Sequence, residues 1–187
     1  LVPQLSTAKS PQQMFGSVMK SYFAESIGVK PENMFTVSIM PCVAKKGESN
    51  MELFYGEYAG HETDVVLTTR ELTRMIRSAH IDPASLVDRE CDPLMKEWTG
   101  AGVIFGTTGG VMEAALRTVY RVLEGKEAPA DFYQLRPVRG LNNRKEAEVT
   151  IAGKNLKVCI LYGTAAAEEF MAEDMSGYHF VEVMTCP

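Results

Sequence analysis

The stretch Met34-Phe-Thr-Val-Ser-Ile-Met40 is followed directly by Pro41 and Cys42. Seven residues rich in β-branched and aromatic side chains predict a strand, and Pro41 ends it because proline cannot donate to a sheet ladder. The strand therefore carries a thiol just past its own carboxyl end. A soft, metal-binding side chain at that position makes this end of the strand the first candidate for a functional site.

Helices are predicted before and after this strand. Ser10 suits an N-cap, with Gln13 completing a capping box, and apolar residues then repeat at helical spacing over about 11–27. Residues 63–68 predict a second short strand, and Thr68-Thr-Arg-Glu71 is another capping box that opens a helix. The segment between the two strands is polar and is expected to be a loop, with a short turn of helix at most.

The second half of the chain also alternates strands with helices. The expected elements are a short buried strand at 101–105, a helix at 111–123, a hairpin formed by 147–152 and 156–161, a helix at 164–174 and a last strand at 179–184. Such alternation is typical of an α/β fold with a mainly parallel sheet flanked by helices. In such sheets, ligands gather at the carboxyl ends of the strands.

Composition excludes several classes of protein. The 187 residues are 45% hydrophobic and 23% charged, which suits one large domain or two small lobes with an ordinary core. The 19 Lys and Arg against 24 Asp and Glu give a net charge of −5 without a basic run, so no nucleic-acid partner is expected. No apolar stretch reaches the roughly 18 residues of a membrane helix, and the N-terminus does not resemble a signal peptide.

Two of the four cysteines follow strand ends with the same spacing. Cys42 comes two residues after Met40, and Cys186 two residues after Met184. Two thiols with neighbouring thioethers at strand ends suit iron–sulfur chemistry, and Lys45 nearby would favour the thiolate and hold an anionic ligand. The alternative interpretation is that both are ordinary buried cysteines.

Other patterns are weaker. Cys159 lies inside an apolar strand and is expected in the core, and Cys91, among acidic residues, has no predicted role. Gly106-Thr-Thr-Gly-Gly110 before a helix suggests an anion cradle, but it lacks both nucleotide-binding spacings; its glycines equally suit close backbone approach. A Ser-His-Asp or Cys-His enzyme has no local signature here.

Four motifs resemble the catalytic domain of the FeFe-hydrogenases, in that family's order. They are Leu5-Ser-Thr-Ala-Lys-Ser-Pro-Gln-Gln13, Ile39-Met-Pro-Cys-Val-Ala-Lys-Lys46, Gly106-Thr-Thr-Gly-Gly-Val-Met-Glu-Ala-Ala-Leu-Arg117 and Val181-Glu-Val-Met-Thr-Cys-Pro187. The resemblance extends over essentially the whole chain. It implies a lobe of the iron-only hydrogenase catalytic domain, which converts protons and electrons to dihydrogen at the H-cluster, a 4Fe-4S cubane joined to a di-iron unit that carries CO, cyanide and a dithiolate.

The resemblance also implies roles for individual residues. Cys42 and Cys186 would be cubane ligands, Lys45 would hydrogen-bond a cyanide ligand, and Ser6 would lie on the proton route. The residues expected around the di-iron unit are Pro11, Gln12, Met40, Phe105 and Met184.

The expected chain is a part of that domain, residues 1–187, truncated at both ends. The family's other two cubane cysteines are absent from it, so the chain by itself is expected to be inactive and to bind no H-cluster. The parent would be a ferredoxin-type hydrogenase. Its expected partners are an electron carrier such as ferredoxin and the remainder of the catalytic domain or a small subunit.

Two other functions stay open. One is a hydrogenase-like iron–sulfur protein without turnover, such as a hydrogen sensor or an iron–sulfur assembly factor, and the other is a generic α/β small-molecule binding domain. A cytoplasmic location is expected, and a periplasmic one is compatible with a signal on another subunit.

Overall fold

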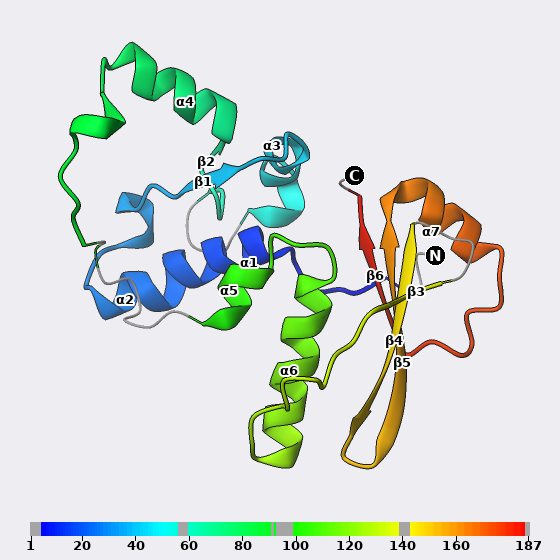
Figure 1. The fold of residues 1–187 in the computed structure, drawn as a ribbon. Helices are drawn as coiled ribbons and strands as arrows, with labels where there is room; N and C mark the ends of the chain where they lie inside the picture. Colours follow the sequence, from blue (N-terminus) through cyan, green and yellow to red (C-terminus); the bar gives the residue numbers. More distant parts are fainter. Residues whose placement is uncertain (1–4, 56–59, 91, 93–98, 139–142, 186–187) are drawn as a thin grey trace. The chain divides into compact units, whose positions relative to one another are not determined.

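The computed structural model describes residues 5–55, 60–90, 92, 99–138 and 143–185. The chain divides into two compact units, residues 1–95 and 96–187, and each is considered by itself. Both units combine strands with helices, which confirms the predicted α/β class (Figure 1). Among the described residues, no helix combines the length and the apolar character needed to cross a bilayer.

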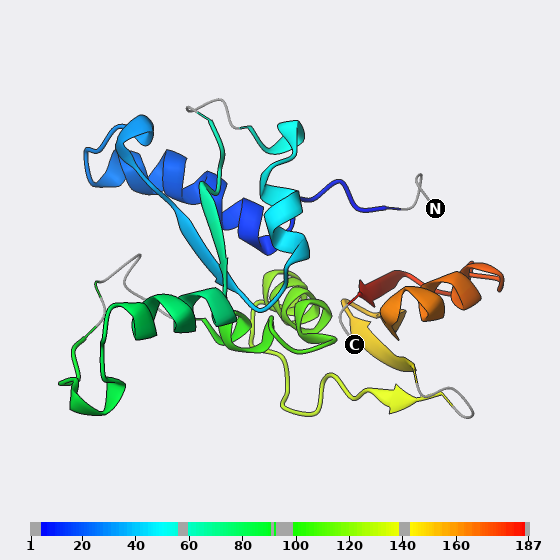
Figure 2. The same ribbon diagram turned by 90° about the horizontal axis from the view of Figure 1, so that it is seen from above.

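The first unit is built around two parallel strands, β1 (Val37–Met40) and β2 (Val65–Thr68), paired from Val37 with Val65 to Met40 with Thr68. Helices α1 and α4 flank the two strands (Figures 1 and 2). The helical elements are α1 (Pro11–Val18), the π-helix η2 (Met19–Phe23), α2 (Ala24–Ser26), η3 (Pro31–Asn33), α3 (Ala44–Ser49), η4 (Glu52–Phe54), α4 (Thr69–Ser78) and η5 (Pro83–Ser85). The two strands and the helix predicted over about 11–27 are thus confirmed.

One of the two predicted capping boxes is complete. The Glu71 backbone N–H donates to Thr68 Oγ1 at 3.2 Å, and the Thr68 N–H donates to Glu71 Oε2 at 2.8 Å. Hydrogen bonds from Lys46 and from Thr68 lower the pKa of the Glu71 carboxyl to about 2. Ser10 does accept the Gln13 N–H at 3.4 Å, but the Gln13 side chain does not return the bond, so the second box was only half correct.

The π turn η2 carries a lysine into the interior of the first unit. Lys20 is 3% exposed, and its ammonium donates to Asp64 Oδ1 at 2.7 Å and to the carbonyl of His61. Burial raises the pKa of the Asp64 carboxyl, but hydrogen bonds from Lys20 and Thr36 outweigh burial and lower it below its usual 3.8. The end of the first helix is therefore tied to the residue that precedes β2.

The second unit contains a four-stranded sheet in the order β3-β4-β5-β6. Its elements are α5 (Gly100–Ile104), α6 (Gly110–Glu124), β3 (Arg136–Pro137), β4 (Arg144–Ile151), β5 (Lys154–Tyr162), α7 (Gly163–Met171) and β6 (Phe180–Met184). Pairs β3–β4 and β4–β5 are antiparallel, and β5–β6 is parallel. The predicted hairpin, the later helices and the last strand are confirmed, but the hairpin makes this sheet mixed rather than mainly parallel.

The strand predicted at 101–105 is wrong, because these residues form helix α5. The Phe105 N–H donates to the Ala101 carbonyl at 3.1 Å, which is a helical turn. A run of five small and apolar residues carries no usable period, so pattern alone cannot separate a strand from a helix.

Strand β5 lies at the centre of the second unit, with α6 against one face of the sheet and α7 against the other (Figure 1). Val158 and Ile160 pack with Met112 and other residues of α6, whereas Cys159 and Leu161 pack with Ala166 and Phe170 of α7. Because successive strand side chains point to opposite faces, four consecutive apolar residues serve two cores. Residues 158–161 are each at most 1% exposed.

We predict that Gly110→Ala destabilises the second unit severely. A Cβ at Gly110 would lie 1.8 Å from the Ile104 carbonyl oxygen, and backbone cannot move away as a side chain can. The expected loss is about 3 kcal/mol or more in the free energy of unfolding, measured by urea denaturation. Gly177→Ala is the control, since nothing lies within 4 Å of its added Cβ, and equal losses in both variants would contradict this account.

Candidate functional site

The first turn of α1 is fastened to the site strand β1 by one side chain. Gln12 is 7% exposed, its Oε1 accepts a hydrogen bond from Ser38 Oγ at 2.9 Å, and its Nε2 donates to the Lys45 carbonyl at 3.5 Å. Three elements, α1, β1 and α3, therefore meet at this amide. Pro11, the first residue of the same helix, is exposed.

Met40 and Cys42 lie at the carboxyl end of β1. Met40 is its last residue and shares a strand face with Ser38, because every second side chain points the same way. Since Ser38 reaches Gln12, this is the face toward α1. Cys42 follows after Pro41, is half-buried, and is a free thiol.

Lys45 lies in the first turn of α3, with its ammonium 2.7 Å from Glu48 Oε2. The i, i+3 spacing of a helix explains this pair. The next lysine, Lys46, has its own carboxylate, Glu71, at 2.7 Å. Each ammonium is thus held by an acidic side chain, so the position of the Lys45 charge depends on Glu48.

The other predicted residues lie in the second unit or near the N-terminus. Phe105 is half-buried and follows α5, and Met184 is the last residue of β6. Ser6 is exposed, and its hydroxyl accepts the Ala8 N–H at 3.1 Å. Cys186, like Cys91, falls outside the described residues.

Gln12 thus joins α1 to β1 and to the start of α3, and Met40, Cys42 and Lys45 lie on these last two elements or on the turn between them. Sequence patterns had missed Ser38 and Glu48, which bind the side chains of Gln12 and Lys45. Within the described part of the chain, no three His, Cys, Asp or Glu side chains form a metal-binding cluster. Of the two predicted metal ligands, only Cys42 lies among the described residues.

The glycine turn before α6 is already occupied by a carboxylate from the same chain. Glu182 of β6 accepts hydrogen bonds from the N–H groups of Gly109 and Met112, both at 2.8 Å. A Cβ at Gly109, whose φ is +88°, would lie 2.5 Å from Ile160 Cδ1. The glycines therefore permit close backbone approach, and the N–H groups that suggested an anion cradle bind Glu182.

Cys159 lies in the core, as predicted, and is fully buried. Burial, the largest cause, raises the pKa of its thiol to about 11. A thiol that resists ionisation is a poor metal ligand and a poor nucleophile.

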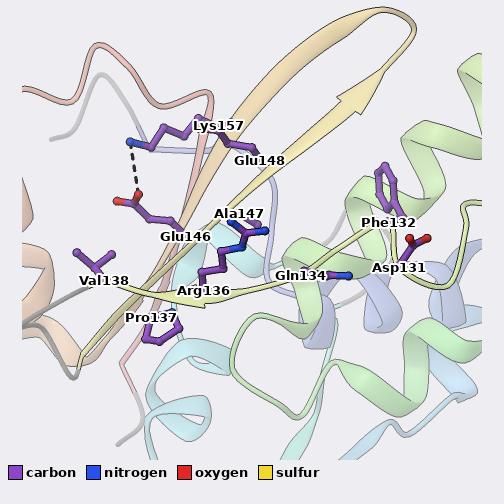
Figure 3. Close-up of a pocket in the computed structure, with 10 residues that line it drawn as sticks. All are labelled: Asp131, Phe132, Gln134, Arg136, Pro137, Val138, Glu146, Ala147, Glu148 and Lys157. Carbon is purple, nitrogen blue, oxygen red and sulfur yellow. Dashed lines mark ion pairs between the residues drawn. The ribbon is translucent and has the colours of Figure 1, made fainter.

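The second unit contains a hollow of about 570 Å³ (Figure 3). Its wall is formed by residues of 131–138 and by the strands β4 and β5, where Lys157 Nζ lies 3.4 Å from Glu146 Oε2. The charged residues on its wall carry both signs, and none of the predicted site residues lines it. Ligand pockets are usually apolar with a few convergent polar groups, so this hollow gives no rival site.

A mixed α/β fold with a free, half-buried thiol at the end of a strand is consistent with an iron–sulfur protein. The model of the family "Iron only hydrogenase large subunit, C-terminal domain" matches residues 1–187, and the chain belongs to this family. Iron hydrogenase 1 of Clostridium pasteurianum is 45% identical over 100% of this chain and 32% of its own length. The periplasmic Fe hydrogenase large subunit of Nitratidesulfovibrio vulgaris is 44% identical, with 100% and 44% covered.

Similarity extends to solved structures and to a second kind of protein. One similar solved structure is of an FeFe-hydrogenase, whose oxygen inactivation is described as starting at the 2Fe subcluster of the H cluster. It matches with a TM-score of 0.80 and 35% identity, and the match covers 100% of this chain and 53% of that chain. The cytosolic iron-sulfur assembly component 3 of Pongo abelii is 33% identical over 100% of this chain and 40% of its own length. The chain thus spans about a third to about half of the length of these proteins.

The donor types of the described residues fit part of an H-cluster site. A free half-buried thiol suits a cubane iron, and an ammonium and a buried amide suit anionic ligands. A thioether on the same strand face is compatible with a soft, apolar wall.

We predict that the two described cysteines differ sharply in reactivity. At pH 8, a thiol with a pKa of about 11 is thiolate in only about one molecule in a thousand, and this fraction rises about tenfold for each pH unit up to 11. Iodoacetamide followed by peptide mass spectrometry should label Cys42 in the folded chain and Cys159 only after denaturation. Labelling of Cys159 at the rate of Cys42 at pH 8 would contradict its burial.

Proposed function

We propose that this chain is part of the catalytic domain of an iron-only hydrogenase, which interconverts dihydrogen with protons and electrons at an H-cluster. The observation that carries the proposal is the free thiol of Cys42 just past the carboxyl end of β1, three residues before Lys45, whose backbone carbonyl accepts a hydrogen bond from Gln12. The family membership and the 45% identity to an iron hydrogenase support it.

Two groups of residues would hold the cluster. Cys42 and Cys186 would bind irons of the cubane, with the remaining thiolates supplied by other parts of the parent protein. Met40, Phe105 and Met184 would form apolar walls of the di-iron pocket. When bound, the H-cluster supplies the redox chemistry in which two protons and two electrons become dihydrogen.

The polar side chains would orient charge around the cluster. The Lys45 ammonium, held in place by Glu48, would donate to an anionic ligand of the di-iron unit, and a charge-assisted bond of this kind is both shorter and stronger than a neutral one. Gln12 and Pro11 would place the start of α1 toward the same ligands. Ser6, whose hydroxyl can both donate and accept, would serve the proton route.

The parent would exchange electrons with a carrier such as ferredoxin and would complete its site with the remainder of the catalytic domain or a small subunit. A cytoplasmic location is proposed, and the periplasmic relative makes the periplasm the alternative.

A second candidate function is that of a hydrogenase-like protein without turnover. The match to cytosolic iron-sulfur assembly component 3 favours it, although at 33% identity rather than 45%. The two functions differ in the di-iron unit, so infrared bands of CO and cyanide in the matured parent protein would separate them. Their absence, together with an intact cubane signal, would favour the second function.

We predict that Cys42→Ala in the full-length parent removes the cluster and abolishes hydrogen evolution, because a cubane cannot replace a lost thiolate with a methyl group. Iron content and gas production are the measurements. The matched control is Cys159→Ala, which should keep iron and activity at a stability cost of about 1–2 kcal/mol. Full iron content in the Cys42 variant would remove this residue from the ligand set.

We also predict that residues 1–187 alone assemble no stoichiometric 4Fe-4S cubane. Of the four cysteines, Cys159 is locked in the core, which leaves at most three thiols for a cluster that takes four. Reconstitution with iron and sulfide should therefore give substoichiometric iron and no cubane spectrum. A stoichiometric cubane spectrum would show that the thiol count is not the limit.

A further inference from the structure

Strand β6 is fastened to the start of helix α6 by one carboxylate. Both oxygens of Glu182 are used: Oε1 accepts from the Gly109 N–H and Oε2 from the Met112 N–H, each at 2.8 Å. The two donors lie 73 and 70 positions earlier in the chain. Glu182 is half-buried, and no ion pair among the described residues includes it.

The start of α6 needs a carboxylate from elsewhere in the chain. Its N-cap is Gly109, which has no side chain to accept the free N–H groups of the first turn. Glu113 lies in that turn, but its carboxylate is paired with Arg117 at 2.8 Å. A negative charge at this end is also favoured by the dipole of a 15-residue helix, so Glu182 acts as the missing cap.

Glu182 and Met184 lie on the same face of β6. In the parallel register, Glu182 is opposite Ile160 and Met184 is opposite Tyr162. Ile160 packs against α6, and side chains two residues apart share a face, so both Glu182 and Met184 belong to the α6 face. Only about 7 Å of strand separates the capped carboxylate from the proposed pocket residue.

The turn between α5 and α6, which Glu182 binds through the Gly109 N–H, is also constrained. Between Phe105 and Gly110, the chain makes tight turns, with the Thr107 N–H donating to Ile104 O at 3.0 Å and the Gly110 N–H to Thr107 O at 2.9 Å. Gly109 and Gly110 have no room for a Cβ. Because the turn is tightly hydrogen-bonded and closely packed, a shift of the glycine turn should also move Phe105.

We propose that Glu182 is a positioning residue of the hydrogenase site. Its carboxylate sets the distance between the Phe105 turn and the end of β6, where Met184 lies and from which the chain continues to Cys186. Two proposed pocket residues from different elements are thus held in one geometry by two hydrogen bonds. This inference rests on the proposed function.

The test is Glu182→Gln in the full-length, matured parent protein. The amide keeps one acceptor but turns an NH₂ group toward an N–H donor, so one bond and the charge are lost. We expect shifted CO and cyanide infrared bands and hydrogen evolution lowered about tenfold to a hundredfold, with the KM for the electron donor unchanged. Glu124→Gln is the matched control, because Glu124 also accepts a backbone N–H, that of Ala152, in an exposed turn.

Unshifted bands and a wild-type rate in the Glu182 variant would overturn the inference and leave Glu182 as a helix cap only. If the variant does not fold, Glu182→Asp, which keeps the charge and shortens the reach, is measured by the same bands. Loss of folding in both variants would also overturn the positioning role.

A wild-type parent that binds a cubane but makes no hydrogen would refute the proposed function separately. The cubane EPR spectrum then becomes the readout: a changed spectrum in the Glu182 variant supports positioning of the cluster ligands, and an unchanged spectrum overturns it.

Discussion

The burial of β5 is the constraint on which the second unit depends. Its residues 158–161 serve two cores at once, because alternate side chains meet α6 and α7. Strand β6 has β5 as its hydrogen-bonded neighbour, so the strand that ends at Met184 takes its register from this buried centre. A polar residue anywhere in this run would leave an unsatisfied group in one of the cores.

Much of the fold could be predicted because its signals are local. The hairpin, the Thr68–Glu71 capping box and the helix that ends before Gly125 each depend on residues a few positions apart. The errors have equally physical causes. Residues 101–105 are too few to show a period, and the Gln13 side chain, predicted to return a bond to the backbone, is instead fully buried, without a hydrogen-bond partner among the described residues.

Only the chemically reactive residues of the candidate site could be predicted from the sequence. Cys42, Lys45 and Gln12 could be named from motifs, and the fold joins Gln12 to the backbone of Lys45 in the first unit. Their supporting residues could not be named in the same way. Ser38 meets Gln12 across 26 positions and Glu182 meets Gly109 across 73, and no local pattern encodes such distances. Reactive groups follow a family's motif, whereas the groups that hold them depend on tertiary packing.

The π turn at Met19–Phe23 has a consequence for comparing this chain with its relatives. A π turn holds more residues than an α turn, so it accommodates a one-residue insertion without breaking the helix. Here the π turn includes Lys20, whose ammonium is bound by Asp64. A relative with a single gap at this place should therefore be interpreted as having a regular helix, in which the residues after the gap are rotated about the helix axis by about 100° relative to this chain.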